Sequence, residues 1–124
     1  MLEEKTYQKI YDEIYIFLTS DWEKLIVYLE YGEGSYSYSF YEKTKSGYVN
    51  GYDLPEVSER AIDNSFKKID KLVLKERNKD KDDQWTNMTM VVTKTGDMHT
   101  DFDYTDLSEG KYQFKKNWKK KYLK

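Results

Sequence analysis

Cysteine is absent from the 124 residues of this chain. Its absence excludes a disulfide framework, a thiolate metal site and a cysteine nucleophile, and it suits a reducing compartment. Histidine occurs once, as His99. A catalytic triad or a zinc site would therefore need every other member from a different residue type.

Long uncharged apolar runs are also missing. No stretch approaches the ~20 residues needed to span a bilayer, and the start at residues 1–5 lacks the basic residues and apolar run of a signal peptide. We therefore expect a cytoplasmic protein without a membrane partner. The length suits one domain over residues 1–124.

Charged and aromatic residues are plentiful. Charged residues make up 35% of the chain, which alone would favour disorder. However, 13 Tyr, 5 Phe and 3 Trp can bury a large area per residue. The composition therefore indicates a folded domain with an aromatic core.

The net charge of −2 hides an asymmetry. Residues 1–110 hold all 23 acidic residues against 14 Lys and Arg, which leaves this body at −9. Residues 111–124 hold seven Lys and no acid, which makes the tail +7. The split is compatible with docking of the tail on the body, with two different partners, or with solubility alone.

Hydrophobic periodicity predicts three helices. Apolar residues recur at three- and four-residue steps in residues 7–18 and from Pro55 to about residue 74. A third amphipathic pattern covers Lys111–Leu123, where Phe114, Trp118 and Tyr122 share one side. We expect that side to be buried and the lysines to be exposed to solvent.

Five strands are predicted, at residues 22–31, 35–41, 48–52, 86–92 and 98–104. A turn at residues 94–96 would pair Val92 with Met98 and Met88 with Phe102. The predicted fold class is α+β, an antiparallel sheet of about five strands with helices packed on one face, in the order α-β-β-β-α-β-β-α.

Acidic residues gather at the end of the second hairpin. The predicted register places His99, Asp101 and Asp103 on one strand face, and Asp106 and Glu109 follow. Same-face neighbours lie about 7 Å apart and cannot all reach one ion, and a carboxylate pair for catalysis needs a cleft. For these acids, a solvated face or a surface for a basic partner is therefore favoured over a catalytic pair.

No motif for a cofactor is present. The chain contains neither a GxxxxGK[ST] phosphate loop nor a GxGxxG fingerprint. We therefore predict no cofactor, no metal site and no catalytic residue, and we expect that the chain is not an enzyme. The lysine-rich tail leaves a nucleic-acid-binding alternative open, although it contains no arginine.

Several short segments follow one another in a distinctive order. They are Ile10-Tyr11-Asp12-Glu13-Ile14, Asp21-Trp22-Glu23-Lys24, the Tyr/Phe strand ending at Phe40, Leu54-Pro55, Trp85, Gly96, Phe102-Asp103-Tyr104 and Trp118 to Leu123. In order and wording these segments resemble the YezG-like antitoxin and immunity-protein family. The family often has Ile-Pro where this chain has Ser20-Asp21, and tends to carry an arginine where Lys115 and Lys116 stand.

The resemblance implies a cytoplasmic antitoxin against a polymorphic, often LXG-type, toxin with a nuclease domain, used in bacterial competition. A body of charge −9 would be steered toward a basic nuclease and would block its nucleic-acid groove. The candidate partner-binding residues are Glu30, Glu33, Asp101, Asp103, Asp106 and Glu109. The alternative is a small nucleic-acid-binding protein that acts through the basic C-terminal helix.

Overall fold

The computed structural model describes residues 2–32 and 35–124. Its elements are α1 (Glu4–Tyr15), β1 (Lys24–Gly32), β2 (Ser35–Thr44), β3 (Gly47–Asn50), a 3₁₀ turn η1 (Gly51–Asp53), α2 (Glu59–Lys79), β4 (Asn87–Thr93), β5 (Met98–Asp103) and α3 (Lys111–Tyr122). The predicted α+β class and element order are confirmed. None of the described helices combines the length and apolar character needed to cross a bilayer.

The five strands form one antiparallel sheet in the order β3-β2-β1-β4-β5. The second hairpin has the predicted register, with Val92 opposite Met98 and Met88 opposite Phe102. Gly96 adopts a φ of +103° in its turn, a conformation that favours glycine. β1 is the central strand, and β5 and the β3-β2 side form the two edges.

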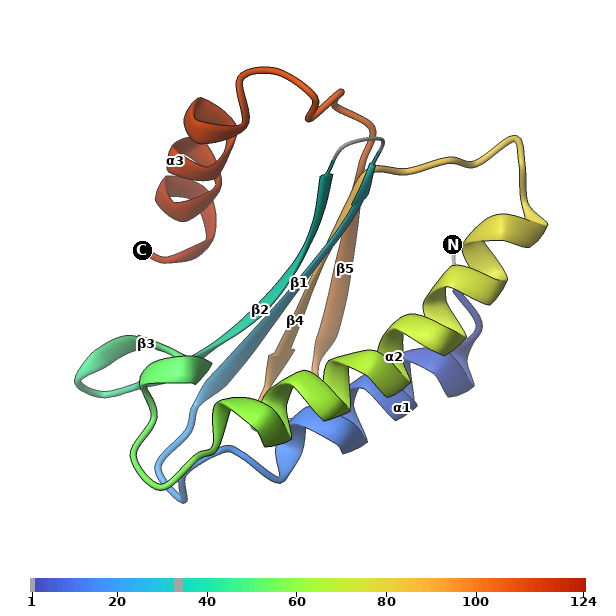
Figure 1. The fold of residues 1–124 in the computed structure, drawn as a ribbon. Helices are drawn as coiled ribbons and strands as arrows, with labels where there is room; N and C mark the ends of the chain where they lie inside the picture. The colour runs from blue at the N-terminus through green and yellow to red at the C-terminus, as the bar shows by residue number, and fades with distance from the viewer. Residues whose placement is uncertain (1, 33–34) are drawn as a thin grey trace.

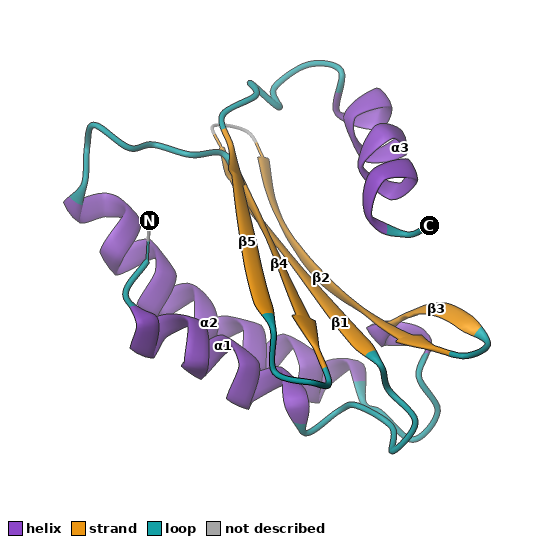
Figure 2. Cartoon of the chain, turned by 180° about the vertical axis from the view of Figure 1, so that it is seen from behind, coloured by secondary structure: helices purple, strands orange, loops and turns teal. Residues whose placement is uncertain are grey.

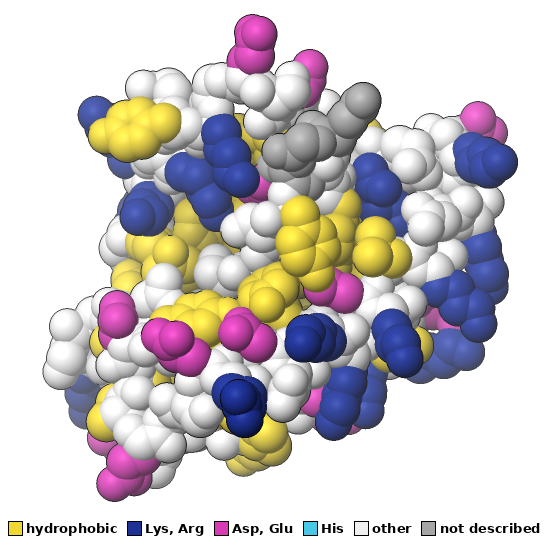
Figure 3. All heavy atoms as spheres, viewed as in Figure 1, with side chains coloured by type: hydrophobic (Ala, Val, Ile, Leu, Met, Phe, Trp, Pro, Cys, Tyr) yellow, Lys and Arg dark blue, Asp and Glu magenta, His cyan; other side chains and the backbone are white. Residues whose placement is uncertain are grey.

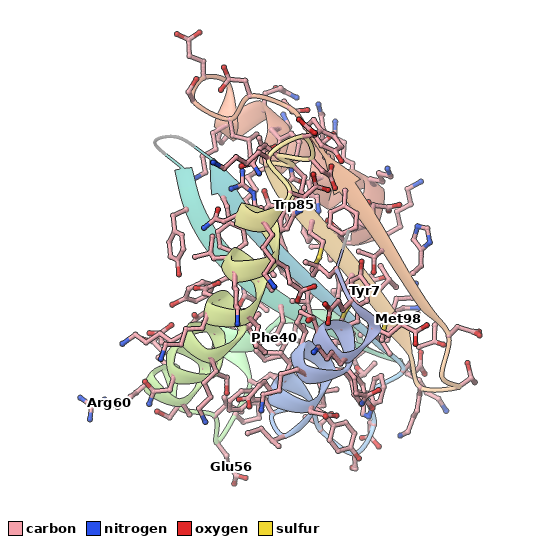
Figure 4. The ribbon with its side chains drawn as sticks, turned by 90° about the vertical axis from the view of Figure 1, so that its right-hand side faces the viewer. Tyr7, Phe40, Glu56, Arg60, Trp85 and Met98 are labelled. Carbon is pink, nitrogen blue, oxygen red and sulfur yellow. The ribbon has the colours of Figure 1, made fainter. Side chains whose placement is uncertain are left out.

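Helices α1 and α2 pack side by side on one face of the sheet (Figures 1 and 2). Alternate residues of β1, from Leu25 to Tyr31, point into this layer and meet Ile10 of α1 and Phe66 of α2. Phe40 and Trp85 lie buried between α2 and the sheet, whereas Glu56 and Arg60 point away from it (Figure 4). Each buried side chain of this kind contributes about 2 kcal/mol.

Helix α3 lies on the opposite face of the sheet (Figure 2), which corrects the expectation that all helices share one face. Trp118 packs against Ile26 and Tyr28 of β1 and is 5% exposed. β1 is therefore buried on both faces. A strand buried on both faces has a continuous apolar run rather than a strict alternation, and residues 25–29 form such a run.

The boundaries of α2 also differ from the prediction. It begins at the Ser58 cap, where the hydroxyl accepts from the Ala61 N–H at 3.4 Å, and not directly at Pro55. It continues to Lys79 rather than ending near residue 74. The polar last turns are held because the Arg77 guanidinium donates to the carbonyl oxygens of Trp85 (2.7 Å) and Tyr31 (3.1 Å).

Candidate functional site

Asp101 and Asp103 point from β5 toward α3. The Asp101 carboxylate accepts from the Tyr122 hydroxyl at 2.5 Å and lies 2.7 Å from His99 Nε2. The Asp103 carboxylate accepts from the Asn87 amide at 3.0 Å and from the Thr105 N–H at 3.1 Å. Both acids are half-buried and fully engaged in local hydrogen bonds.

Both carboxylates are ionised at neutral pH. Partial burial raises the pKa of Asp101, but the hydrogen bonds from Tyr122 and His99 outweigh it and leave the pKa below its usual value. Burial also raises the pKa of Asp103, and the hydrogen bonds from Thr105 and Asn87 likewise lower it overall. His99 itself is exposed, with 70% of its side chain in solvent.

Asp106 and Glu109 lie in the segment between β5 and α3, and both are exposed. The Asp106 carboxylate accepts from the Ser108 N–H at 2.9 Å. The side chain of Ser108 and this N–H together hold the pKa of Asp106 below the usual range. The structure thus places four of the six sequence-predicted acids along one path, from the α3-facing side of β5 to the start of α3.

The other two acids have different positions. Glu30 is fully buried beneath α3, where its carboxylate accepts from the Tyr28 hydroxyl at 2.6 Å and pairs with Lys111 Nζ at 2.8 Å. It therefore does not reach the surface while α3 is docked. Glu33 lies outside the described residues.

Lys115 completes the buried cluster beneath α3. Its ammonium group lies 3.5 Å from the centroid of the Tyr28 ring, a cation-π contact. Burial lowers the pKa of Lys115 to about 8, against the opposing attraction of Glu30. Two of the seven tail lysines therefore belong to the α3 interface and not to its outer face.

A pocket of about 280 Å³ is lined by residues of α3, β4 and β5. Asp101, Asp103, Asn87, Trp118 and Tyr122 are among the residues that line it. Within the described part of the chain, no group of three or more His, Cys, Asp or Glu residues is placed to hold a metal ion. The pocket therefore brings acidic and aromatic side chains together.

A seam of tyrosines and aspartates joins β2 to α2 and was missed by the sequence reasoning. Asp70 accepts from the hydroxyls of Tyr31 and Tyr36, and Asp63 accepts from those of Tyr38 (3.1 Å) and Tyr52 (2.6 Å). Two aspartates seven residues apart face one side of a helix, beside a strand with alternating tyrosines. That spacing was the available signal.

Comparison with known proteins shows which family has a matching sequence. The family model described as "Immunity protein YezG-like" matches residues 3–124. The chain belongs to the YezG-like family. A curated relative, "Immunity protein YezG" from Bacillus spizizenii, is 28% identical over 109 residues, which cover 82% of this chain and 68% of the relative.

Membership of the YezG-like family gives the chain an immunity role, in which the partner is a protein toxin. The family resemblance inferred from the residues is thereby confirmed. For a YezG-like protein the functional site is a binding surface, so the relevant features are exposed charge, exposed aromatic rings and free main-chain groups. The acidic path and the β2 side of the tyrosine seam both supply such features.

Proposed function

We propose that this chain is the cytoplasmic antitoxin of a bacterial nuclease toxin of the polymorphic class used in competition. A single domain over residues 1–124 binds the toxin domain and occludes its nucleic-acid-binding or active site, without any catalysis. The family match over residues 3–124 is the observation that carries the proposal. The name of the Bacillus relative supports it.

Charge supports a nuclease as the partner. Residues 1–110 have 23 acidic residues against 14 basic ones, a charge of −9. A nuclease presents positive potential to its nucleic acid, so an acidic antitoxin is attracted to the same surface. Asp101, Asp103, Asp106 and Glu109 form the acidic path that we assign to this contact.

Glu30 and Glu33 take a secondary place in the proposal. Glu30 is buried by α3, so it would reach a toxin only if that helix moved, and it otherwise acts by holding Lys111 (2.8 Å). Glu33 follows directly after β1 in the sequence and remains a candidate contact. Neither residue is required for the acidic path to bind.

Co-expression provides the test in cells. The toxin domain encoded beside this chain is expressed alone, with the chain, and with the double variant Asp106→Lys/Glu109→Lys. The chain is expected to restore growth and keep cellular nucleic acid intact, and the double variant to protect less. A matched control is Asp80→Lys/Asp82→Lys, which changes the charge equally at the loop after α2. Continued killing in the presence of the unaltered chain would contradict the proposal.

A second candidate function is direct nucleic-acid binding by α3. Lys116, Lys119 and Lys120 are exposed on this helix, which favours that reading. If they bind phosphates, affinity for a nucleic-acid duplex falls steeply with salt and is lost when the three lysines are changed to glutamine. If the chain shows no salt-dependent binding to a labelled duplex, this candidate function is excluded.

A further inference from the structure

The β2 side of the sheet has an edge that is only half covered. β3 pairs with Tyr41–Thr44 and no further. Among the described residues, Ser35–Phe40 pairs with β1 on one side and with no strand on the other. About half of β2 therefore forms a free edge.

Two backbone hydrogen bonds fix which groups point outward from this edge. The Lys43 carbonyl accepts from the Glu23 N–H at 2.7 Å, so the odd-numbered residues of β2 face β1. The Tyr31 N–H donates to Thr86 on the β4 side, so its partner Tyr36 is in a non-hydrogen-bonded pair with β1. Both observations direct the N–H and C=O groups of Tyr36 and Tyr38 outward.

This free edge lacks the usual protection against strand pairing. Residues 35–41 contain no charged residue and no proline, the features that commonly block exposed edges. The opposite edge, β5, differs because it carries His99, Asp101 and Asp103. One edge of the sheet is thus protected and the opposite edge, at β2, is not. This difference indicates that the β2 edge has a partner.

Rings beside the free edge are held in place before any partner arrives. Tyr36 is 57% exposed, yet its hydroxyl is bound to Asp70. Tyr38 stacks on Phe66 at a centroid distance of 4.3 Å, and its hydroxyl is bound to Asp63. Figure 3 shows hydrophobic side chains gathered on this side of the molecule, between the lysines of α3 and the charged side chains of α2. Fixed tyrosines lose little entropy when they bind a partner.

On the other face of the same edge the side chains are small and the neighbours are basic. Ser37 and Ser39 lie opposite Glu30 and Tyr28 of β1. Lys111 and Lys115 of α3 contact those two residues. A strand added outside β2 would thus have the tyrosine rings on one face and the lysines of α3 near the other.

We propose that Ser35–Phe40 binds an extended segment of the toxin as a sixth strand of the sheet. The segment has apolar side chains toward Tyr36 and Tyr38, and acidic or polar side chains on alternate positions toward α3. Main-chain hydrogen bonds supply affinity and the alternating side chains supply specificity. The inference rests on the proposed function, because the toxin is the partner.

Amide hydrogen exchange of the full chain, resolved by residue, tests the added strand. The probe is the purified toxin domain encoded beside this chain, with an inactivating substitution. In the free protein, Tyr36 and Tyr38 amides are expected to exchange fast, whereas Ser37 and Ser39 amides are slow because they face β1. In the saturated complex all four amides are expected to be slow. Unchanged fast exchange at Tyr36 and Tyr38 would overturn the inference.

Substitutions separate the backbone from the ring. Tyr36→Ala removes the ring, and we expect Kd to rise about tenfold. Tyr36→Pro also removes the outward N–H, and we expect a further rise of about fivefold or more. The matched control is Thr100→Pro, because Asp97 and Asp103 carbonyls bond to β4 and therefore Thr100 points outward on the other edge. Thr100→Pro is expected to leave Kd within about twofold.

The outcomes distinguish this inference from the proposed function. A toxin that is bound and inhibited while the Tyr36 and Tyr38 amides stay unprotected contradicts the added strand alone. A toxin that is neither bound nor inhibited contradicts both proposals. A concentration-dependent dimer of the chain that Tyr36→Pro abolishes would assign the edge to a second copy and also overturn the inference.

Discussion

Single residues decide how β2 is attached to α2. Asp70 is 5% exposed and is the shared acceptor of Tyr31 and Tyr36. The desolvation of these tyrosines and their bonds to Asp70 raise the pKa of both hydroxyls, so both tyrosines stay neutral and act as hydrogen-bond donors. Loss of Asp70 would leave the buried Tyr31 hydroxyl without its acceptor.

Asp70→Ala is therefore expected to lower the free energy of unfolding by about 2 kcal/mol. Urea denaturation at pH 7 measures it. The control is Asp97→Ala, at an exposed position in the second hairpin, which should change stability by no more than about 0.5 kcal/mol. Equal effects of the two variants would show that the shared acceptor contributes nothing.

Gly51 allows η1 to approach β2 closely. A Cβ atom at this position would lie 2.2 Å from the Phe40 ring. We expect Gly51→Ala to destabilise the fold by about 1–3 kcal/mol, and Phe40→Leu in the same chain to recover part of that loss through the space it frees. Thermal denaturation of the two single variants and the double variant checks this, and strictly additive losses would contradict it.

At the scale of elements, the attachment of α3 depends on one aromatic anchor and one charged cluster. Trp118 is buried, and its indole N–H donates to the Thr89 hydroxyl at 2.9 Å. The stripe of Phe114, Trp118 and Tyr122 was readable in the sequence because apolar residues on a helix recur at such steps. The sequence did not show which face of the sheet α3 covers, because both faces of β1 offer apolar residues.

Trp118→Ala should release α3. We expect a loss of up to about 3 kcal/mol, with amide exchange accelerated first in residues 111–122. Tyr112→Ala, at a ring that is 81% exposed, should change stability by less than about 0.5 kcal/mol. If α3 amides remained as protected in Trp118→Ala as in the unaltered chain, the anchor would lie elsewhere.

Lys115 gives the α3 cluster a pH dependence. Its folded pKa of about 8 lies below the unfolded value of 10.5, so the unfolded chain binds more protons between these values. Stability from this group is therefore lowest below pH 8 and rises as pH increases toward 10.5. Lys115→Met should remove that rise when unfolding is measured at pH 7, 8, 9 and 9.5. An identical slope in the variant would contradict this.

For the molecule as a whole, the sequence was informative about topology and less so about the surface. Strand alternation, the Gly96 turn and helical stripes are local signals, so element order and the second hairpin's register could be predicted. Burial of Glu30 could not be predicted, because it depends on where α3 docks, and α3 begins only at Lys111. The tyrosine seam left one local signal, the seven-residue spacing of Asp63 and Asp70, but that spacing does not specify which strand the two aspartates meet.

The charge of the whole molecule predicts how the rate of association with the toxin depends on salt. If the acidic body steers association, the association rate constant falls as salt increases while the dissociation rate changes little. Asp106→Lys/Glu109→Lys should lower the rate at low salt and flatten its dependence. Stopped-flow mixing at 20–300 mM salt (roughly 20 Å to 6 Å of screening length) checks this. A rate independent of salt would contradict steering.

Titration of nuclease activity tests the central claim most directly. The purified chain is added in steps to its cognate toxin domain while cleavage of labelled DNA and RNA is followed. The account predicts that cleavage stops at a fixed stoichiometric ratio and that Asp106→Lys/Glu109→Lys needs more protein to reach the same inhibition. Full cleavage in the presence of a large excess of the chain would contradict it.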